Sequence, residues 1–441
     1  MTECSKAVLR HLLILTAALL VAPSGSARKT TAAPERKRIA VARCVTEAAT
    51  ILRRDGEIGQ PWHAVTEKET LYNGDMLVGL SGSILESQSG KLCLTFLSQL
   101  DGTSSQPIIE SAVVLHPNDD TDLDFTLDRG RVELTNRQGK GAARARVRLR
   151  GEVWDVTLGE PGTRIALELY GRWPRGVPFS HEPGRNQVPT AHLICLVMKG
   201  DVSLKHQGLE YAMSAPPGAA LMGWDSIAGQ DSTPQRVGKL PEWASAGKTA
   251  DAHKRAAGQE RFRKVAASQS IHSAIDQLLD SDEAGDRIRA VYLLTALDEL
   301  PRLAKALHKA KHRDVCDTAV LALRHWIGRA PGQDQRLYDA LLKSEFSPVE
   351  AETVMQLLHG FTEADTSRPE TYETLIAYLN HNKVIIRGLA HWHLSRLAPE
   401  GRELGYDPVA AKDARTAAIA KWKQLIPSGK LPPRPREKEK E

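Results

Sequence analysis

The pattern of apolar and polar positions changes once along the chain, near residue 226. From about 39 to 225, short apolar or alternating runs are separated by turns such as Asn73-Gly-Asp75 and Lys199-Gly-Asp201. Closely spaced short runs without a helical period are typical of an antiparallel β-sandwich, a roll or a short β-solenoid. We therefore expect a β-domain over residues 39–225.

Apolar residues recur with a helical period from about residue 263. Ile288, Val291 and Tyr292 share one expected helix face, and breaks fall at positions such as Pro348. Pairing of these helices into hairpins gives a repeat of roughly 35 residues, which indicates an α-solenoid. We expect this helical repeat domain over 263–427.

Two polar stretches flank the expected helical domain. Residues 226–262 are rich in Gly, Ser, Pro, Lys and Ala, so we expect a linker that turns helical near its end. Residues 428–441 consist almost entirely of Pro, Lys, Arg and Glu, which predicts a disordered charged tail.

The amino terminus has the three parts of a secretory signal. Lys6 and Arg10 precede an apolar run over 12–22, and small residues at Gly25 and Ala27 suit cleavage after Ala27. The alternative is a retained membrane anchor, but the run is about half the roughly 20 residues of a spanning helix. We expect a signal peptide over 1–27, an exported periplasmic or envelope protein, and no integral membrane span after removal of the signal.

Composition narrows the function classes only slightly. The 441 residues are 41% hydrophobic and 26% charged, and the net charge of +5 gives no reason to expect nucleic acid as a partner. Cysteines at 44, 93, 195 and 316 are too far apart to indicate a disulfide framework or a metal pair.

The sequence shows no familiar catalytic motif. It has no phosphate-binding Gly loop, no His-Glu-x-x-His, no Gly-x-Ser-x-Gly and no paired Cys-x-x-Cys, so we expect no enzyme and no cofactor. The best candidate for a calcium site is the acidic run over residues 119–124. An EF-type loop, however, would have Gly where this chain has Phe125 and an acidic residue where it has Arg131. His391 and His393 lie two apart on an expected helix and point in different directions. We expect no metal site.

Arginine occupies every second position of one apolar run: Arg144, Arg146, Arg148 and Arg150. On a strand these four guanidinium groups would line one face. Burial would cost several kcal/mol for each unpaired ion, so the face must meet water or an anionic partner. A solvated sheet face is one interpretation. The other is a contact with an acidic glycan, a lipid headgroup or a protein, and the absence of interleaved aromatics argues against single-stranded nucleic acid.

Eight spaced strand-turn-strand pieces lie in order between residues 56 and 223. They are Trp62, Glu69–Leu77, Gly82–Glu86, Gly90–Leu94, Leu127–Val132, Pro161–Ile165, Met198–Leu204 and Pro217–Ala219. Together they resemble the FecR family of bacterial extracytoplasmic β-domains. FecR regulators carry an anti-sigma segment and a membrane helix before this domain, whereas the chain resembles the sensor domain without its transmitting half. The resemblance implies envelope sensing or a signalling accessory.

Two helical segments, Asp314–Leu323 and Val384–Leu394, resemble the second helix of HEAT repeats, which implies a protein-binding surface. The leading hypothesis is a non-enzymatic extracytoplasmic binding or scaffold protein with a protein partner at the cell envelope. An anionic polymer or glycan is a further expected partner. The alternative is a carbohydrate-binding or carbohydrate-active β-sandwich with an accessory helical domain. It would need an aromatic platform formed from residues such as Trp62, Trp154 and Trp173.

Overall fold

The computed structural model describes residues 37–56, 60–98, 110–174, 176–184, 186–244, 250–308, 310–426 and 431–433. The chain divides into two compact units, Met1–Arg38 and Ile39–Glu441, and the description below concerns the second. The expected signal peptide, and all of the expected tail except residues 431–433, lie outside the described residues. Within the described ranges, no helix is both long and apolar enough to cross a membrane.

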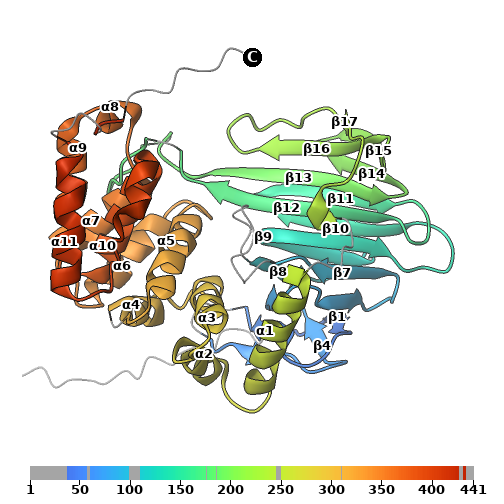
Figure 1. The fold of residues 1–441 in the computed structure, drawn as a ribbon. Helices are drawn as coiled ribbons and strands as arrows, with labels where there is room; N and C mark the ends of the chain where they lie inside the picture. The colour runs from blue at the N-terminus through green and yellow to red at the C-terminus, as the bar shows by residue number, and fades with distance from the viewer. Residues whose placement is uncertain are drawn as a thin grey trace, which may run out of the picture. The chain divides into compact units, whose positions relative to one another are not determined.

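Strands fill the amino-terminal part of the second unit, as expected (Figure 1). They are β1 Ala40–Cys44, β2 Ile51–Arg54, β3 His63–Ala64, β4 Thr70–Tyr72, β5 Met76–Gly79, β6 Ile84–Ser87, β7 Leu92–Phe96, β8 Ser111–His116, β9 Leu123–Asn136, β10 Ala143–Leu149, β11 Glu152–Leu158, β12 Arg164–Arg172, β13 Thr190–Lys199, β14 Asp201–His206, β15 Leu209–Ser214, β16 Ala219–Asp225 and β17 Gln235–Arg236. The sheet is mixed, because β10 runs parallel to β9. The expectation of a purely antiparallel arrangement is therefore wrong at this pair.

Strand β9 belongs to two ladders. Its first half pairs with β8 and β10, and its second half pairs with β7 and β12. The strand exchanges its pairing partners at Gly130. Gly130 has φ +85°, and a Cβ there would collide with the carbonyl oxygen of Glu110. Only glycine meets both demands. Side chains from both ladders meet in one hydrophobic core.

Helices fill the carboxy-terminal part. They are η1 Glu242–Ala244, α1 Ala250–Ala266, α2 Ile271–Leu279, α3 Ala284–Ala296, α4 Leu300–His308, α5 Arg313–Ile327, α6 Gln333–Leu342, α7 Pro348–His359, α8 Glu363–Thr366, α9 Pro369–Tyr378, α10 Val384–Leu397, η2 Pro399–Leu404 and α11 Lys412–Gln424. The order of strands followed by helices confirms the expected β-then-α organisation at this level.

One arginine contact recurs in two of the expected repeats. Arg287 of α3 donates to the carbonyl oxygen of Ser281 at 2.7 Å, and Arg387 of α10 donates to that of His381 at 2.7 Å. Each guanidinium thereby ties its helix to the preceding loop, six residues earlier. The corresponding position of α5 holds Cys316 instead. A Cβ added at Gly388 would collide with the Cys316 sulfur, so α10 crosses α5 closely although α6, α7, α8 and α9 intervene in sequence.

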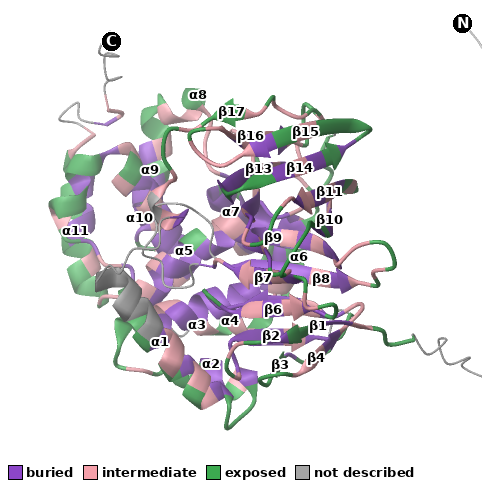
Figure 2. Ribbon diagram, turned by 90° about the vertical axis from the view of Figure 1, so that its right-hand side faces the viewer, coloured by how far each residue is buried: buried purple, intermediate pink, exposed green. Residues whose placement is uncertain are grey.

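The strand-rich and helical parts share a second hydrophobic core. Leu52 and Val78 from the strands join Phe262 and Leu293 from the helices. Buried residues (purple in Figure 2) occur on the strands and on the adjoining helices alike. The expected linker 226–262 contributes β17, η1 and most of α1, and Trp243 lies against the Arg131 guanidinium at 3.6 Å. The boundaries of two separate domains stay a prediction.

Candidate functional site

The arginine row on β10 is largely matched by carboxylates. Its apolar neighbours at 145, 147 and 149 are buried, and the Arg144 residue is exposed on the other face. Arg146 Nε lies 2.7 Å from Asp155 Oδ1, and Arg148 Nη2 lies 2.7 Å from Asp124 Oδ2. These acids come from the neighbouring strands β11 and β9. The expectation of four unpaired like charges is therefore wrong for Arg146 and Arg148.

Arg150 does not belong to the row. Strand β10 ends at Leu149, and Arg150 sits in the following turn with φ +46°. Its guanidinium donates to the carbonyl oxygen of Arg329, just after α5. Burial lowers the pKa of Arg150. Three arginines therefore share the exposed strand face, and the fourth joins the strand-rich part to the helical part.

The acidic turn before β9 is occupied by basic partners. Asp122 accepts the Arg144 backbone N–H at 2.9 Å and lies 3.2 Å from Lys91 Nζ. Asp124 is the partner of Arg148. Among the described residues there is no cluster of three His, Cys, Asp or Glu side chains suited to holding a metal ion.

The histidines and tryptophans singled out from the sequence lie in packed surroundings. His391 contacts Ser395 Oγ at 3.1 Å, His393 contacts the Leu357 carbonyl oxygen at 2.6 Å, and burial lowers both pKa values to about 4. Trp62 Nε1 donates to the Leu297 carbonyl oxygen at 3.0 Å, and Trp154 stacks on His206 at 3.9 Å. Trp173 donates to His359. These indole rings do not form the exposed platform that the carbohydrate hypothesis needs.

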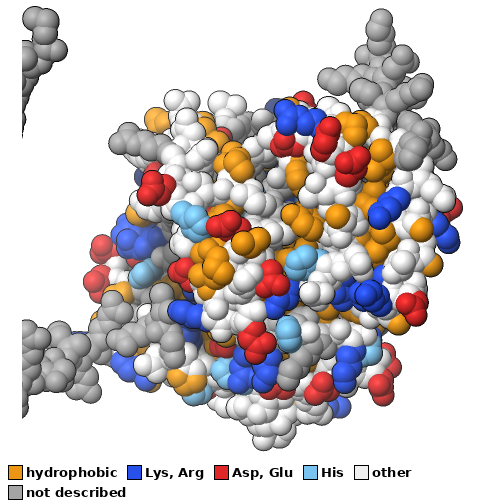
Figure 3. Space-filling model, turned by 90° about the vertical axis from the view of Figure 1, so that its left-hand side faces the viewer, with side chains coloured by type: hydrophobic (Ala, Val, Ile, Leu, Met, Phe, Trp, Pro, Cys, Tyr) orange, Lys and Arg blue, Asp and Glu red, His pale blue; other side chains and the backbone are white. Residues whose placement is uncertain are grey.

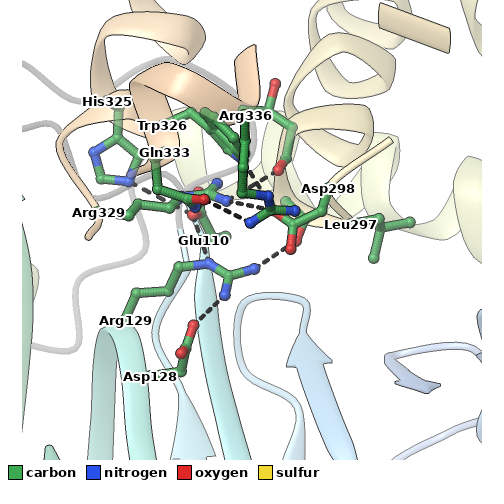
Figure 4. A network of polar contacts seen from close by, with 12 residues as sticks. Glu110, Asp128, Arg129, Leu297, Asp298, His325, Trp326, Arg329, Gln333 and Arg336 are labelled. Atoms are coloured by element: carbon green, nitrogen blue, oxygen red, sulfur yellow. Dashed lines mark hydrogen bonds and ion pairs between the residues drawn. The ribbon is translucent and has the colours of Figure 1, made fainter. Parts of the chain in front are cut away.

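The most perturbed charged groups lie in a network between the strands and the helices (Figure 4). At its centre is Glu110, whose side chain is 0% exposed. Arg129 Nε of β9 lies 2.9 Å from its Oε1, and Arg329 contacts the same oxygen from the helical side. His325 Nε2 lies 3.6 Å from this Glu110 oxygen.

The same two arginines bind the carboxy-terminal end of α3. Arg129 Nη2 donates to the Ala296 carbonyl oxygen at 2.5 Å, and Arg329 Nη1 donates to that of Thr295 at 3.1 Å. The last carbonyls of a helix lack partners within the helix and carry partial negative charge, so cations stabilise them. Asp298 completes the set, accepting from Arg329 at 3.2 Å.

The pKa shifts follow from these contacts. Burial alone would raise the pKa of Glu110, but Arg329, His325 and Arg129 together hold it well below its usual range. Burial lowers the pKa of Arg329 to about 10 although Glu110 opposes the change. For Arg129, Asp128 and Glu110 outweigh burial and raise the pKa. The opposite charges of the network thus keep Glu110 and Arg129 ionised despite their burial.

Four cavities among the described residues lie away from this network. One of about 370 Å³ is lined by Trp62, His63 and His272, and another of about 620 Å³ lies beside Arg261 and Asp286. A third, of about 350 Å³, lies between residues 45–50 and residues 81–83. A fourth, of about 400 Å³, lies between the end of α7 and the start of α9. The strongly shifted groups of the network line none of these four cavities.

Sequence reasoning missed the Glu110 network. A signal was nevertheless present, because Asp128-Arg129-Gly130-Arg131 breaks the alternation of apolar and polar residues in the middle of β9 with three charged residues. Charged residues inside a buried strand require partners. Arg129 pairs with Glu110 and Arg131 pairs with Glu168, which lie 19 and 37 residues away in sequence. Arg329 joins Glu110 from the helical part, so the pairing itself could not be read from spacing.

Comparison with known proteins adds no relative: no protein-family model, no curated protein and no solved structure matches this chain. The resemblances to FecR domains and HEAT repeats therefore remain expectations.

Proposed function

We propose that this chain is a non-enzymatic extracytoplasmic binding or scaffold protein, in which a FecR-like β-sandwich or roll carries a HEAT-like helical array. One observation carries the proposal. The groups with strongly shifted pKa values around Glu110 pair with one another between the two parts and line none of the four cavities described above. Catalytic acids and bases need shifted pKa values together with access to a substrate.

The contact between the parts supports a scaffold role. The contact contains both buried hydrophobic residues and the ion pairs of Glu110. Movement of the helical part relative to the strand-rich part would therefore separate buried ions from their partners. Breaking such a pair costs about 3–5 kcal/mol. A contact of this kind holds exposed surfaces of the two parts at a fixed relative orientation.

The exposed surfaces suit protein partners. On the face of the helical part in Figure 3, apolar side chains lie in patches between charged ones of both signs. Non-obligate protein–protein contacts have about the same apolar fraction as the rest of a protein surface, so this face is compatible with a protein partner. On the strand side, the Arg144 side chain has no ion pair among the described residues, so it is the member of the predicted anion-binding set best placed to meet an anionic envelope component. The carbohydrate alternative has less support because Trp62 and Trp154 are buried.

Site-specific photo-cross-linking in envelope fractions tests the proposal. A photoreactive residue replaces Leu321 on α5, which is 46% exposed, or Val153 on β11, which is 42% exposed. We expect a discrete protein adduct from at least one site in the envelope fraction. A photoreactive residue at buried Leu293 serves as the negative control. The absence of any adduct, or turnover of envelope polysaccharide by the purified chain, would contradict the proposal.

A further inference from the structure

Two arginines lie over one tryptophan on the helical part. The Cζ atom of Arg324, on α5, lies 4.3 Å from the centroid of the Trp392 ring on α10. The Cζ atom of Arg396, one turn after Trp392, lies 4.7 Å from it. Trp392 is partly exposed and Arg396 is exposed, so this cluster is open to solvent.

The end of α7 holds the cluster in place. Arg324 Nη1 donates to the Leu358 carbonyl oxygen at 2.5 Å, and His393 contacts the Leu357 carbonyl oxygen at 2.6 Å. The His393 ring lies edge-on to Trp392, with centroids 4.8 Å apart. Arg324 and Trp392 are therefore positioned by the fold before any ligand binds, which lowers the entropy cost of binding.

The positive charge of the cluster is not balanced by a carboxylate. Among the residues that the structure describes, neither Arg324 nor Arg396 forms an ion pair with Asp or Glu. Burial, followed by the nearby charge of Arg396, lowers the pKa of Arg324 to about 10. The contrast with Arg146 and Arg148 is direct, because each of those has a carboxylate at 2.7 Å. An incoming anion would relieve this excess of positive charge.

Apolar surface adjoins the charges. Leu321 is 46% exposed and lies one turn before Arg324 on α5, so both side chains share a helix face. The Trp392 ring supplies further apolar area. Guanidinium groups bind carboxylates through paired N–H donors, and the apolar neighbours would receive an aliphatic side chain.

The termini of this chain are poor candidates as occupants. Residues 428–441 contain five basic and three acidic side chains, and residues 28–38 contain five basic and one acidic side chain. A cationic segment does not complement two arginines. A long polyanion is also a poorer fit, because such ligands are bound by extended basic tracks rather than by two arginines beside Leu321.

We propose that Arg324, Trp392 and Arg396 form the binding site for an acidic segment with interspersed aliphatic residues, supplied by a partner protein. The inference rests on the proposed binding function and names the class of its partner. The carboxylates contact the two guanidinium groups, and the aliphatic residues contact Trp392 and Leu321.

Fluorescence anisotropy with the full chain tests the site. The probe is a fluorescein-labelled peptide of alternating Glu and Leu, and the comparison peptide has Gln in place of Glu. We expect Arg396→Gln to weaken binding of the Glu peptide at least about tenfold, the equivalent of one lost charge-assisted contact. Arg302→Gln is the matched control, because Arg302 is an exposed arginine of the helical part that already pairs with Asp276. It should change binding less than about twofold.

Charge reversal sharpens the test, since Arg396→Glu should weaken binding of the Glu peptide further. Equal binding of the Gln peptide, no binding of the Glu peptide by the wild-type chain, or an unchanged affinity of Arg396→Gln would each overturn the site. Loss of heparin binding in Arg396→Gln, with binding of the Glu peptide unchanged, would also overturn it. If the peptide result is negative while envelope adducts from Leu321 or Val153 persist, this inference fails and the proposed binding function stands.

Discussion

Two sets of arginines in this molecule have opposite surroundings. Arg146 and Arg148 lie on the outer face of β10, where Arg146 pairs with the partly exposed carboxylate of Asp155 and Arg148 pairs with the buried carboxylate of Asp124. Arg129 and Arg329 are almost wholly buried between the strands and α3, where they share Glu110 and helix carbonyls. The first set was visible in the sequence as a pattern, and the second was not.

The difference teaches that periodicity alone does not identify the charges that matter most to the fold. Exposed ion pairs contribute about 0–1 kcal/mol because water and salt screen them. Removing one partner of a buried pair costs about 3–5 kcal/mol because the other ion stays desolvated. The exposed Arg146–Asp155 pair should therefore tolerate change, whereas the buried network should not.

The largest effect is expected from Glu110→Gln, which keeps the shape and removes the shared negative charge. Arg129 and Arg329 would then face each other across a neutral side chain. We expect a loss of about 3–5 kcal/mol in the free energy of unfolding, measured by urea denaturation followed by circular dichroism. A cost no larger than that of Asp155→Asn on the surface would contradict the comparison.

A second buried contact between the parts should depend on pH. His359 accepts a hydrogen bond from Trp173 and contacts the Val177 carbonyl oxygen, and its Nε2 lies 3.8 Å from Asp334 Oδ2. Burial, aided by the nearby charge of Arg324, lowers the pKa of His359 to about 4. The unfolded chain binds this proton near pH 6.5, so the stabilisation is complete above 6.5 and is lost as pH falls towards 4.

The loss due to His359 should be roughly 2 kcal/mol between pH 7 and pH 5. His359→Gln can still accept from Trp173 and cannot titrate. Between pH 7 and pH 5, the free energy of unfolding of His359→Gln should therefore fall by about 2 kcal/mol less than that of the wild type. Parallel pH profiles for the variant and the wild type would show that the histidine is protonated in the folded chain.

A smaller effect is expected on the surface row. Asp155→Asn removes the partner of Arg146, where the two side chains are 44% and 31% exposed. Water can solvate the remaining guanidinium, so we expect a change below about 1 kcal/mol in the free energy of unfolding. Urea denaturation at low and high salt checks this, and the difference from wild type should shrink as salt increases.

The smallest expected effect concerns anion binding by the row. Arg144 lacks an ion pair in the described residues, whereas Arg146 and Arg148 have carboxylate partners. On a heparin column, Arg144→Gln should reduce the slope of log affinity against log salt concentration by about one, and Arg146→Gln should reduce this slope by less. Arg150 is left intact because it contacts the Arg329 carbonyl. If both variants elute with the wild type, the row is only a solvated face.

The sequence by itself determined the change from strands to helices near residue 226. Alternation of apolar residues with period two, followed by a helical period, is a local property of the chain, so strand β10 and the faces of its residues could be predicted. Gly130 was visible as a turn residue, but its crossing between two ladders was not. Nor was the parallel pairing of β9 with β10 visible in the sequence.

Only the tertiary structure decided which charges are compensated. Asp155 neutralises Arg146 because β11 lies beside β10, and Glu110 meets Arg329 across more than two hundred residues of chain. By the same rule, Arg324 and Arg396 stand out because the packing of α5 and α10 gives them a shared tryptophan and, within the described part of the chain, no carboxylate partner. Electrostatic energy depends on distance and burial, and neither quantity is a local property of the sequence.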